Sequence, residues 1–296
     1  MIGRARRVRK AALAAMLGAL AVTSLARATE PPIMRVDNPW NRIAITFDAC
    51  ATKTHGYGFD RPIYRILQRE QIPSTIFISG RWGEFHARVM TELAADPLIE
   101  FGNHSYDHPH MPRLSDGDIQ REIDETEAVL GRFGKRSVAF RPPFGDISDR
   151  MIDVVRARGL PVVMWDVVSG DPSASATAPG MIHVVSQKTR SGSIVIFHIN
   201  GRGRQTAAAL PTILKRLRAR GFQFVRLSEL LTGGAAHSLA VATAPAAPAS
   251  IHPARTDGHS LAFCDPPAPT DRVFPSETTP LIAPPSERGH KEPAHP

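Results

Sequence analysis

The chain has 296 residues, of which 42% are hydrophobic and 22% charged, and its formal net charge is +8. This composition excludes a chain that is disordered throughout and a multi-span membrane protein. Two cysteines exclude a disulfide-rich scaffold and a four-cysteine zinc site. A positive charge of this size is typical of proteins that bind nucleic acid or another anionic surface, so its position along the chain decides what it means.

Most of that charge lies at the N-terminus, which has the layout of a secretory signal. Residues 1–28 contain six basic residues and no acidic one. An apolar run from Ala11 to Leu25 follows the basic stretch, and residues 26–28 fit a small-x-small cleavage site. The run is short for a membrane span, which needs roughly 20 residues. We predict a signal peptide over 1–28 and an exported protein, periplasmic or secreted, with no stable membrane span. An uncleaved membrane anchor is the alternative.

The C-terminal segment differs in composition from the middle of the chain. Residues 233–296 hold 12 of the 26 prolines and are otherwise rich in Ala, Ser, Thr and His. Such a segment buries too little apolar surface to offset its chain entropy, so we predict a disordered tail over 233–296. Without residues 1–28, the chain has 30 basic and 28 acidic residues. We therefore expect no nucleic-acid partner.

Between these ends, short apolar runs alternate with longer helical patterns. The predicted strands are 42–47, 74–79, 99–102, 137–140, 161–167, 193–197 and 222–227. The predicted helices are 59–70, 84–95, 115–132, 148–158, 179–190 and 205–220, with Ser115 as the cap of the third. Apolar strands indicate a sheet covered on both faces, and the alternation predicts parallel pairing. We predict an α/β fold, a distorted and incomplete (β/α)7 barrel with parallel strands, over 39–232, after a linker at 29–38.

Titratable side chains follow most of the predicted strands. They are Asp48 after the first strand, His104 and His108 after the third, Arg141 after the fourth, Asp171 after the fifth and His198 after the sixth. The C-terminal ends of parallel strands share one face of a barrel, where active sites are built. We therefore expect these side chains to converge on one site.

Each of these residues has a chemical and a structural interpretation. His104 and His108, spaced i and i+4 on one helical turn, can reach one divalent metal ion, or they can be ordinary core histidines. Asp48 ends a buried strand and needs a partner such as Arg141, or it caps the next loop. His198 suits a general acid.

Asp171 could orient the His198 imidazole, as carboxylates often do in catalytic sites. A structural histidine, and a turn that begins at Asp171-Pro172, are the alternatives.

Together these segments resemble the polysaccharide deacetylases, the NodB-homology family 4 carbohydrate esterases, over about 39–232. Five stretches follow the order of the family's motifs: Thr46-Phe47-Asp48-Ala49, His104-Ser105-Tyr106-Asp107-His108, Arg141-Pro142-Pro143-Phe144-Gly145, Trp165 to Asp171-Pro172, and Ile196-Phe197-His198. One such motif would be weak, whereas five in order are specific.

The resemblance implies a metal-dependent hydrolase that removes N-acetyl groups from an extracytoplasmic amino-sugar polymer, such as peptidoglycan or a chitin-like glycan. His104 and His108 would bind Zn²⁺, or Co²⁺ or another divalent ion. Asp48 would be the general base, steadied by Arg141. The remaining implied roles are a leaving-group acid at His198, its orientation by Asp171, an oxyanion contact near Phe144, and substrate binding at Phe144 and Trp165.

Departures from the family's pattern keep other functions open. Ala49 replaces the second aspartate of the T-F-D-D motif, the family's third metal ligand, and Pro172 replaces the usual tryptophan. We expect weakened or rearranged metal binding. Candidate substitutes for the missing ligand are Asp48, Cys50, His55 and Asp60, although a strand neighbour such as Cys50 should point away from the site. A non-catalytic glycan-binding wall protein, and a hydrolase of another non-peptide C–N bond, are the alternatives.

The two cysteines also leave a choice. Cys50 and Cys264 could pair in an oxidising compartment. Because one lies at a strand end and the other in the tail, we favour two unpaired thiols.

Overall fold

The computed structural model describes residues 30–51 and 58–233. The chain divides into two compact units, Met1–Cys264 and Asp265–Pro296, and every described residue belongs to the first. The predicted signal peptide, His55, Cys264 and all but the first residue of the predicted tail lie outside the described residues. In the described part of the chain, no helix has the length and apolar character needed to cross a bilayer.

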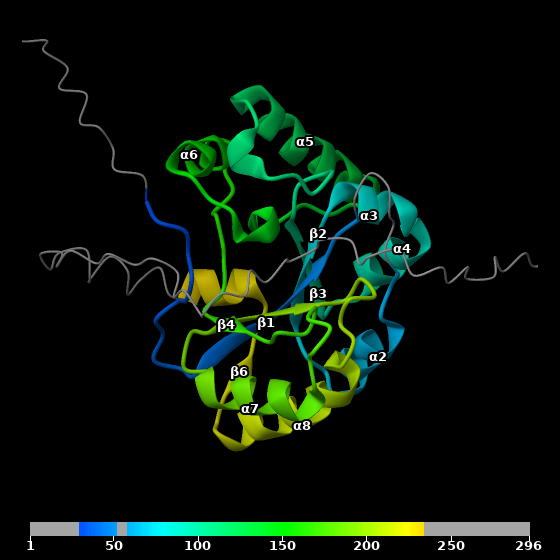
Figure 1. Cartoon of the computed structure of the whole chain (residues 1–296), viewed down its shortest axis with the longest axis vertical. Helices are drawn as coiled ribbons and strands as arrows, with labels where there is room; N and C mark the ends of the chain where they lie inside the picture. The colour runs from blue at the N-terminus through cyan, green and yellow to red at the C-terminus, as the bar shows by residue number, and fades with distance from the viewer. Residues whose placement is uncertain (1–29, 52–57, 234–296) are drawn as a thin grey trace, which may run out of the picture. The chain divides into compact units, whose positions relative to one another are not determined.

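A parallel sheet forms the centre of the unit (Figure 1). Its strands are β1 (Arg42–Ala49), β2 (Ser74–Ile78), β3 (Ile99–Asn103), β4 (Val167–Val168), β5 (Ile194–His198) and β6 (Gln223–Phe224). The order is β3-β2-β1-β5-β4, with β6 also paired to β1, and every strand pair is parallel. This confirms the predicted α/β class with parallel strands.

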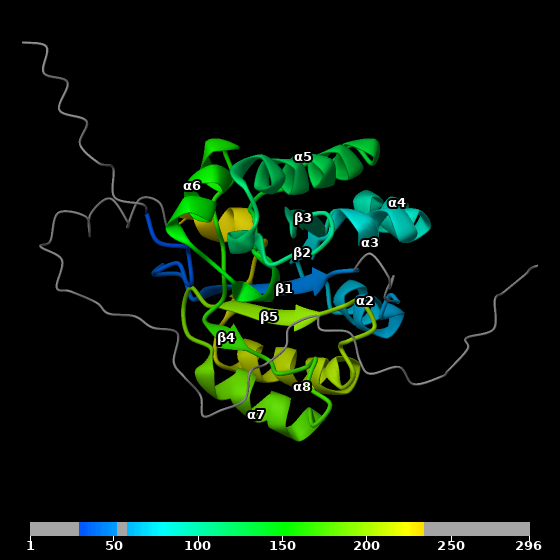
Figure 2. The ribbon, with the colours of Figure 1, turned by 45° about the horizontal axis from the view of Figure 1, so that its top comes forward.

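Helices cover both faces of the sheet, which explains its apolar strands. They are α2 (Arg61–Arg69), α3 (Gly80–Phe85), α4 (Ala87–Ala95), α5 (Asp116–Arg132), α6 (Asp149–Ala157), α7 (Ala178–Lys188) and α8 (Thr206–Ala219). In Figure 2, α3 to α6 lie on one side of β1 and β5, and α7 and α8 lie on the other. Every residue of β2 and β5 is buried, as expected for strands covered on both faces.

Helix boundaries follow local capping chemistry. The Ser115 side chain accepts a hydrogen bond from the Asp118 amide, so the predicted cap of α5 is confirmed. The prediction of a single helix over 84–95 is wrong. The structure has α3 and α4 there, separated at His86, whose φ of −115° and ψ of 37° are not helical.

The predicted strands at 137–140 and 161–167 are much reduced. Phe140 forms isolated parallel bridges to Asn103 and Val162, and the only regular strand in the second range begins at Val167. Two prolines, Pro142 and Pro143, follow this segment. They lack the backbone N–H that a longer ladder needs, which leaves the barrel incomplete on this side.

The segment predicted as a linker pairs with the barrel. Ile33 bridges to Val163 and Arg35 to Ser193, and the Val36 side chain is buried. Gly192 has a φ of +82°, and a Cβ there would overlap the Val36 backbone carbonyl. Glycine is required at that position because the two backbones approach so closely.

Candidate active site

The register of the sheet brings titratable residues together at the C-terminal ends of the strands. Asp48 of β1 is paired directly with His198 of β5. Farther along the sheet, Asn103 ends β3 and forms a parallel bridge with Phe140. The residues that follow this bridge, His104 and Arg141, are therefore neighbours in space. Asp48 and His198, which are 150 positions apart in the sequence, therefore share one end of the barrel.

Asp48 and Arg141 form a buried ion pair. Arg141 Nη1 donates to Asp48 Oδ1 at 2.7 Å, and Nη2 donates to Thr46 Oγ1 at 3.0 Å and to the Met164 carbonyl at 3.1 Å. Arg141 is fully buried, and its guanidinium lies 3.9 Å from the centre of the Phe77 ring. Burial alone would raise the pKa of the Asp48 carboxyl, but the charge and the hydrogen bond of the Arg141 guanidinium hold that pKa below its ordinary value. Asp48 is therefore an ionised carboxylate, as a general base must be.

The two histidines are buried beside this pair. His104 Nδ1 donates to the Arg141 carbonyl at 2.7 Å, which leaves Nε2 with a lone pair, 3.6 Å from Asp48 Oδ2. Neither ring nitrogen of His108 has a hydrogen-bond partner among the described residues, although only 3% of this residue is exposed. Burial lowers the pKa of both imidazoles, that of His108 well below its ordinary value. Neutral imidazoles with unsatisfied nitrogens fit a divalent metal ion.

The histidine motif does not form the helical turn that its spacing suggested, so this prediction is wrong. Residues 104–108 form a loop in which Ser105 and His108 have positive φ angles of 60° and 59°. The Glu122 carboxylate of α5 accepts hydrogen bonds from the Tyr106 and Asp107 amides, both at 2.8 Å. This carboxylate takes the place of helical hydrogen bonds and holds the loop so that the two rings lie 4.9 Å apart.

A second buried carboxylate holds His198. Asp171 Oδ1 accepts a hydrogen bond from His198 Nδ1 at 2.9 Å, and Asp171 Oδ2 accepts one from the His198 amide at 2.6 Å. Thr206 and Ser169 hydroxyls also donate to this carboxylate. Asp171 thereby fixes the tautomer and the orientation of the imidazole.

Cys50 lies with the histidines, so the expectation that it points away is wrong. Its Sγ and one nitrogen from each of His104 and His108 lie within 4.8 Å of one another. Asp48 and Cys50 are two residues apart and share one side of the chain, whereas Ala49 is buried in the main apolar cluster. Cys50 is disulfide-bonded, so the expectation of an unpaired thiol is also wrong, and the only other cysteine in the sequence is Cys264.

Asp60, another candidate ligand, has a different role. It precedes α2, and its Oδ2 accepts hydrogen bonds from the Gly201 amide at 2.8 Å and the Gly203 amide at 3.4 Å. These bonds anchor the loop that follows β5. The structure does not group Asp60 with the two histidines.

The two residues predicted to bind substrate lie in different environments. Phe144, with a φ of 60°, packs edge-on against His108 and stacks on His110 with ring centroids 4.2 Å apart. His110 in turn contacts the Asp146 carboxylate. Trp165 is half-buried and packs in a separate apolar cluster, with Arg141 5.6 Å from its ring. Phe144 is thus beside the histidines, and Trp165 supports the arginine.

Three features were missed by reasoning from the sequence. They are the amide of Asn200, the carboxylate of Glu122 and the contact between His110 and Asp146. Asn200 lies two residues after His198, a spacing that places it on the same side of the chain and could have identified it. The other two depend on tertiary contacts that no spacing in the sequence indicates.

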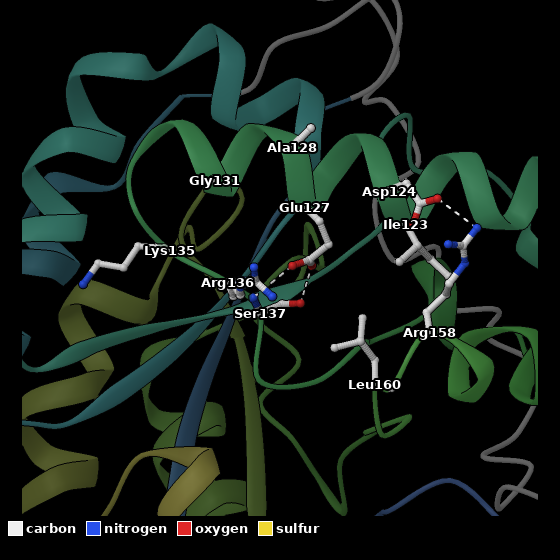
Figure 3. A pocket seen from close by; sticks show the side chains of 11 residues that line it. Ile123, Asp124, Glu127, Ala128, Gly131, Lys135, Arg136, Ser137, Arg158 and Leu160 are labelled. Atoms are coloured by element: carbon white, nitrogen blue, oxygen red, sulfur yellow. Dashed lines mark hydrogen bonds and ion pairs between the residues drawn. The ribbon is translucent and has the colours of Figure 1, made fainter.

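A cavity of about 590 Å³ lies away from these residues, between α5 and the segments 135–137 and 158–160 (Figure 3). Three of its charged side chains have partners: Arg158 contacts Asp124 at 2.9 Å, and Glu127 accepts hydrogen bonds from Ser137. None of the residues from the strand ends lines it. We therefore do not assign the chemistry to this cavity.

Two buried carboxylates, each paired with a basic side chain (Asp48 with Arg141, Asp171 with His198), lie with the neutral His104 and His108. This arrangement is suited to metal-assisted hydrolysis. Comparison with known proteins agrees. Residues 35–163 match the sequence profile of the polysaccharide deacetylases. Over 199 residues the chain is 29% identical to a peptidoglycan-N-acetylglucosamine deacetylase of Bacillus cereus, covering 66% of this chain and 91% of that protein. It is also 29% identical over 167 residues to the uncharacterized protein YlxY of Bacillus subtilis, of which it spans about half the length (51%), with 56% of this chain covered.

Solved structures share the fold. A family 4 carbohydrate esterase pseudoenzyme from Bacillus anthracis has a TM-score of 0.60 and 25% identity, with 69% of each chain covered. A mutant of such a pseudoenzyme, described as having restored enzymatic activity, has the same TM-score and 26% identity, covering 69% of this chain and 72% of that one. The chain carries a polysaccharide deacetylase domain of the NodB-homology type, similar to solved structures of carbohydrate esterase family 4. The predicted family is confirmed.

Proposed function

We propose that the protein is a metal-dependent hydrolase that removes N-acetyl groups from an extracytoplasmic amino-sugar polymer, peptidoglycan or a chitin-like glycan. The observation that carries this proposal is the pairing of Asp48 with Arg141 and of His198 with Asp171 on neighbouring strands, beside two neutral histidines. These pairs supply a base and an acid at one site. Hydrolysis of an amide needs both, because a proton leaves the attacking water and another must reach the departing nitrogen.

The side chains divide the proton transfers between them. Asp48, kept ionised by Arg141, accepts the proton of the attacking water. In its imidazolium form, with a proton on each ring nitrogen, His198 donates from Nδ1 to Asp171 and delivers the Nε2 proton to the amine that leaves the acetyl carbon. The products are acetate and a free amino sugar.

His104 and His108 would hold the metal ion, zinc in the first instance and cobalt as a substitute. Such an ion supplies positive charge that polarises the acetyl carbonyl and makes the attacking water more acidic. The unsatisfied nitrogens of His108 support this assignment. Phe144, beside His108 and exposed in part, is a suitable contact for the sugar ring.

The relatives and the N-terminus support the choice of substrate and compartment. The Bacillus cereus relative is named for deacetylation of peptidoglycan N-acetylglucosamine, and such a polymer lies outside the cytoplasm. The basic and apolar layout of residues 1–28 agrees with export by a cleaved signal, giving a periplasmic or secreted protein.

A second function is a non-catalytic glycan-binding protein on the same fold. Ala49 in place of the family's ligand favours it, as does the similarity to a family 4 pseudoenzyme. Measurement of bound metal separates the two functions. Stoichiometric zinc that is lost in the His104→Ala variant favours the enzyme, and a metal-free protein that still binds glycan favours the alternative.

The direct test is release of acetate by the purified chain from acetylated chitooligosaccharides and from peptidoglycan, with Zn²⁺ or Co²⁺ added. The assay is run with and without a dithiol reductant, because Cys50 is disulfide-bonded. We expect acetate release that falls by about 10²–10⁴-fold in His198→Asn. The Arg226→Gln variant, altered outside the strand-end cluster in a surface ion pair with Glu229, is the control. No acetate from any glycan, with metal occupancy verified, would count against the enzyme.

A further inference from the structure

A sulfur atom lies beside the two histidines, one residue after the position where the family's motif has a carboxylate. Ala49 ends β1, and its methyl group is buried in the main apolar cluster, where it offers no ligand. The next residue, Cys50, is 1% exposed and places Sγ within 4.8 Å of a ring nitrogen of both His104 and His108. The chain therefore brings three metal-ligand atoms together without position 49.

The spacing of these atoms is close to that of a metal centre. Zinc–nitrogen and zinc–sulfur bonds of about 2.0–2.3 Å put tetrahedral ligand atoms roughly 3.3–3.6 Å apart. Donors that lie within 4.8 Å of one another need inward movements of only about 1 Å. Small side-chain rotations can supply a change of that size.

The histidines are already prepared as ligands. His108 has two buried ring nitrogens without a hydrogen-bond partner among the described residues, an arrangement that is costly unless something else satisfies them. His104 donates from Nδ1 to the Arg141 carbonyl, so its Nε2 carries the lone pair. A hydrogen bond of this kind from the second nitrogen is the usual support for a metal-binding histidine.

The surroundings of Cys50 suit a thiolate. The Asn200 side-chain nitrogen lies 3.3 Å from Sγ and donates to the Cys50 carbonyl at 2.8 Å. A donor at that distance stabilises negative charge on sulfur. Asp48, the other nearby anion, is held by Arg141 at 2.7 Å and is thereby kept for proton transfer.

We propose that Cys50, once its disulfide is reduced, is the third protein ligand of a His104–His108–Cys50 centre for zinc or cobalt. Thiolate and imidazole together favour these ions over magnesium or calcium. This inference rests on the metal dependence in the proposed function and names the ligand that the family's pattern lacks. It also makes metal loading depend on redox state, because a disulfide sulfur is not a thiolate.

The reaction balances with a dithiol as reductant. The dithiol gives two electrons to the disulfide of Cys50 and becomes a disulfide itself, and two protein thiols form. When the metal binds, the Cys50 thiol releases its proton to solvent and sulfur bonds to the ion. An oxidant that takes two electrons from the thiols reverses the first step and removes the ligand.

The test compares cobalt binding by the oxidised and the reduced full chain. Co²⁺ bound by a thiolate gives a sulfur-to-cobalt charge-transfer band in the near ultraviolet, which imidazole and carboxylate ligands do not give. We expect one Co²⁺ per chain with this band after treatment with a dithiol that is then removed, and at least about 100-fold weaker binding before it. The Cys264→Ser variant, which leaves no second cysteine for an intrachain disulfide, should bind Co²⁺ with the band without reduction.

Variants separate this inference from the proposed function. In Cys50→Ala and Cys50→Ser we expect loss of the band and weaker binding by about 100-fold or more, with circular dichroism confirming the fold. Tight binding that His104→Ala abolishes, but that shows no sulfur band in the reduced chain, would overturn the cysteine ligand and leave the proposed function standing. Equal affinity of the oxidised and reduced chains would overturn the dependence on redox state. No metal binding in either state would overturn both.

Discussion

Replacing Arg141 with methionine is expected to destabilise the domain more than most single substitutions. Methionine keeps much of the length and apolar volume of arginine but has no charge and no hydrogen-bond donor. The change removes three hydrogen bonds, to Asp48, Thr46 and the Met164 carbonyl, from a side chain that is fully buried. The substitution is costly because the three acceptors stay buried after their donor is removed.

The magnitude follows from those partners. A buried ion pair that loses one member typically costs about 3–5 kcal/mol, because the other charge is left without compensation. Each buried neutral acceptor that loses its donor adds about 1–3 kcal/mol, although the terms are not fully additive. We expect a loss of about 4–6 kcal/mol in the free energy of unfolding, a large part of the roughly 5–15 kcal/mol typical of a domain.

Urea unfolding followed by circular dichroism measures this loss. A double-mutant cycle with Asp48→Asn tests its cause, because asparagine removes the charge that Arg141 compensates. The double variant should lose at least about 2 kcal/mol less than the sum of the single variants. Should Arg141→Met not fold, Arg141→Lys, which keeps the charge and loses the planar fork, replaces it in the cycle. Strictly additive losses would refute the reasoning, since they would mean that the pair contributes nothing as a pair.

Three further substitutions test the supports of the site. Glu122→Ala removes the acceptor of two amides in the loop 104–108. The free energy of unfolding, measured by denaturation, should fall by about 1–3 kcal/mol, and the metal affinity, measured by cobalt titration, should weaken. An unchanged affinity would argue against the role of Glu122 in holding the loop. Asp171→Asn should lower kcat for acetate release by about 10²–10⁴-fold with little change in KM, and a change in KM alone would contradict its action through His198. Gly192→Ala should cost about 2 kcal/mol or more, because its φ of +82° and the close backbone beside it leave no room for a methyl group. A thermal midpoint equal to that of the wild type would show that the backbone adapts.

The regular part of the fold was predictable because its strands are buried on both faces. The apolar runs of β1, β2 and β5 differ from the predicted strands by no more than two residues at either end. The segment 137–140 was not predictable to the same degree, since its pairing is limited to single bridges by the prolines that follow Arg141. Propensity locates an extended segment, whereas the length of its ladder depends on the neighbours it meets.

The histidine motif shows a different limit. The spacing of His104 and His108 suggested a helical turn, and the rings do lie close together, but a loop with two positive φ angles brings them there. That loop depends on Glu122, which lies on a helix that begins eight residues after His108. Spacing within a motif therefore identifies the partners of a site, and the tertiary contact that shapes it has no local signature.

Side chains alternate between the two faces of a strand, so the side predicted for Cys50 depends on which residue the count starts from. Measured from Ala49, a strand places Cys50 on the opposite side, and the family's missing ligand at position 49 made that comparison the natural one. Measured from Asp48, the same rule places Cys50 on the side of the base, and the structure has its sulfur beside both histidines. On the proposal that Cys50 is a metal ligand, alanine at position 49 and cysteine at position 50 are two parts of one exchange of ligands. On the proposal that the protein is exported, this exchange has a chemical consequence, because a carboxylate is indifferent to oxidation and a thiol is not.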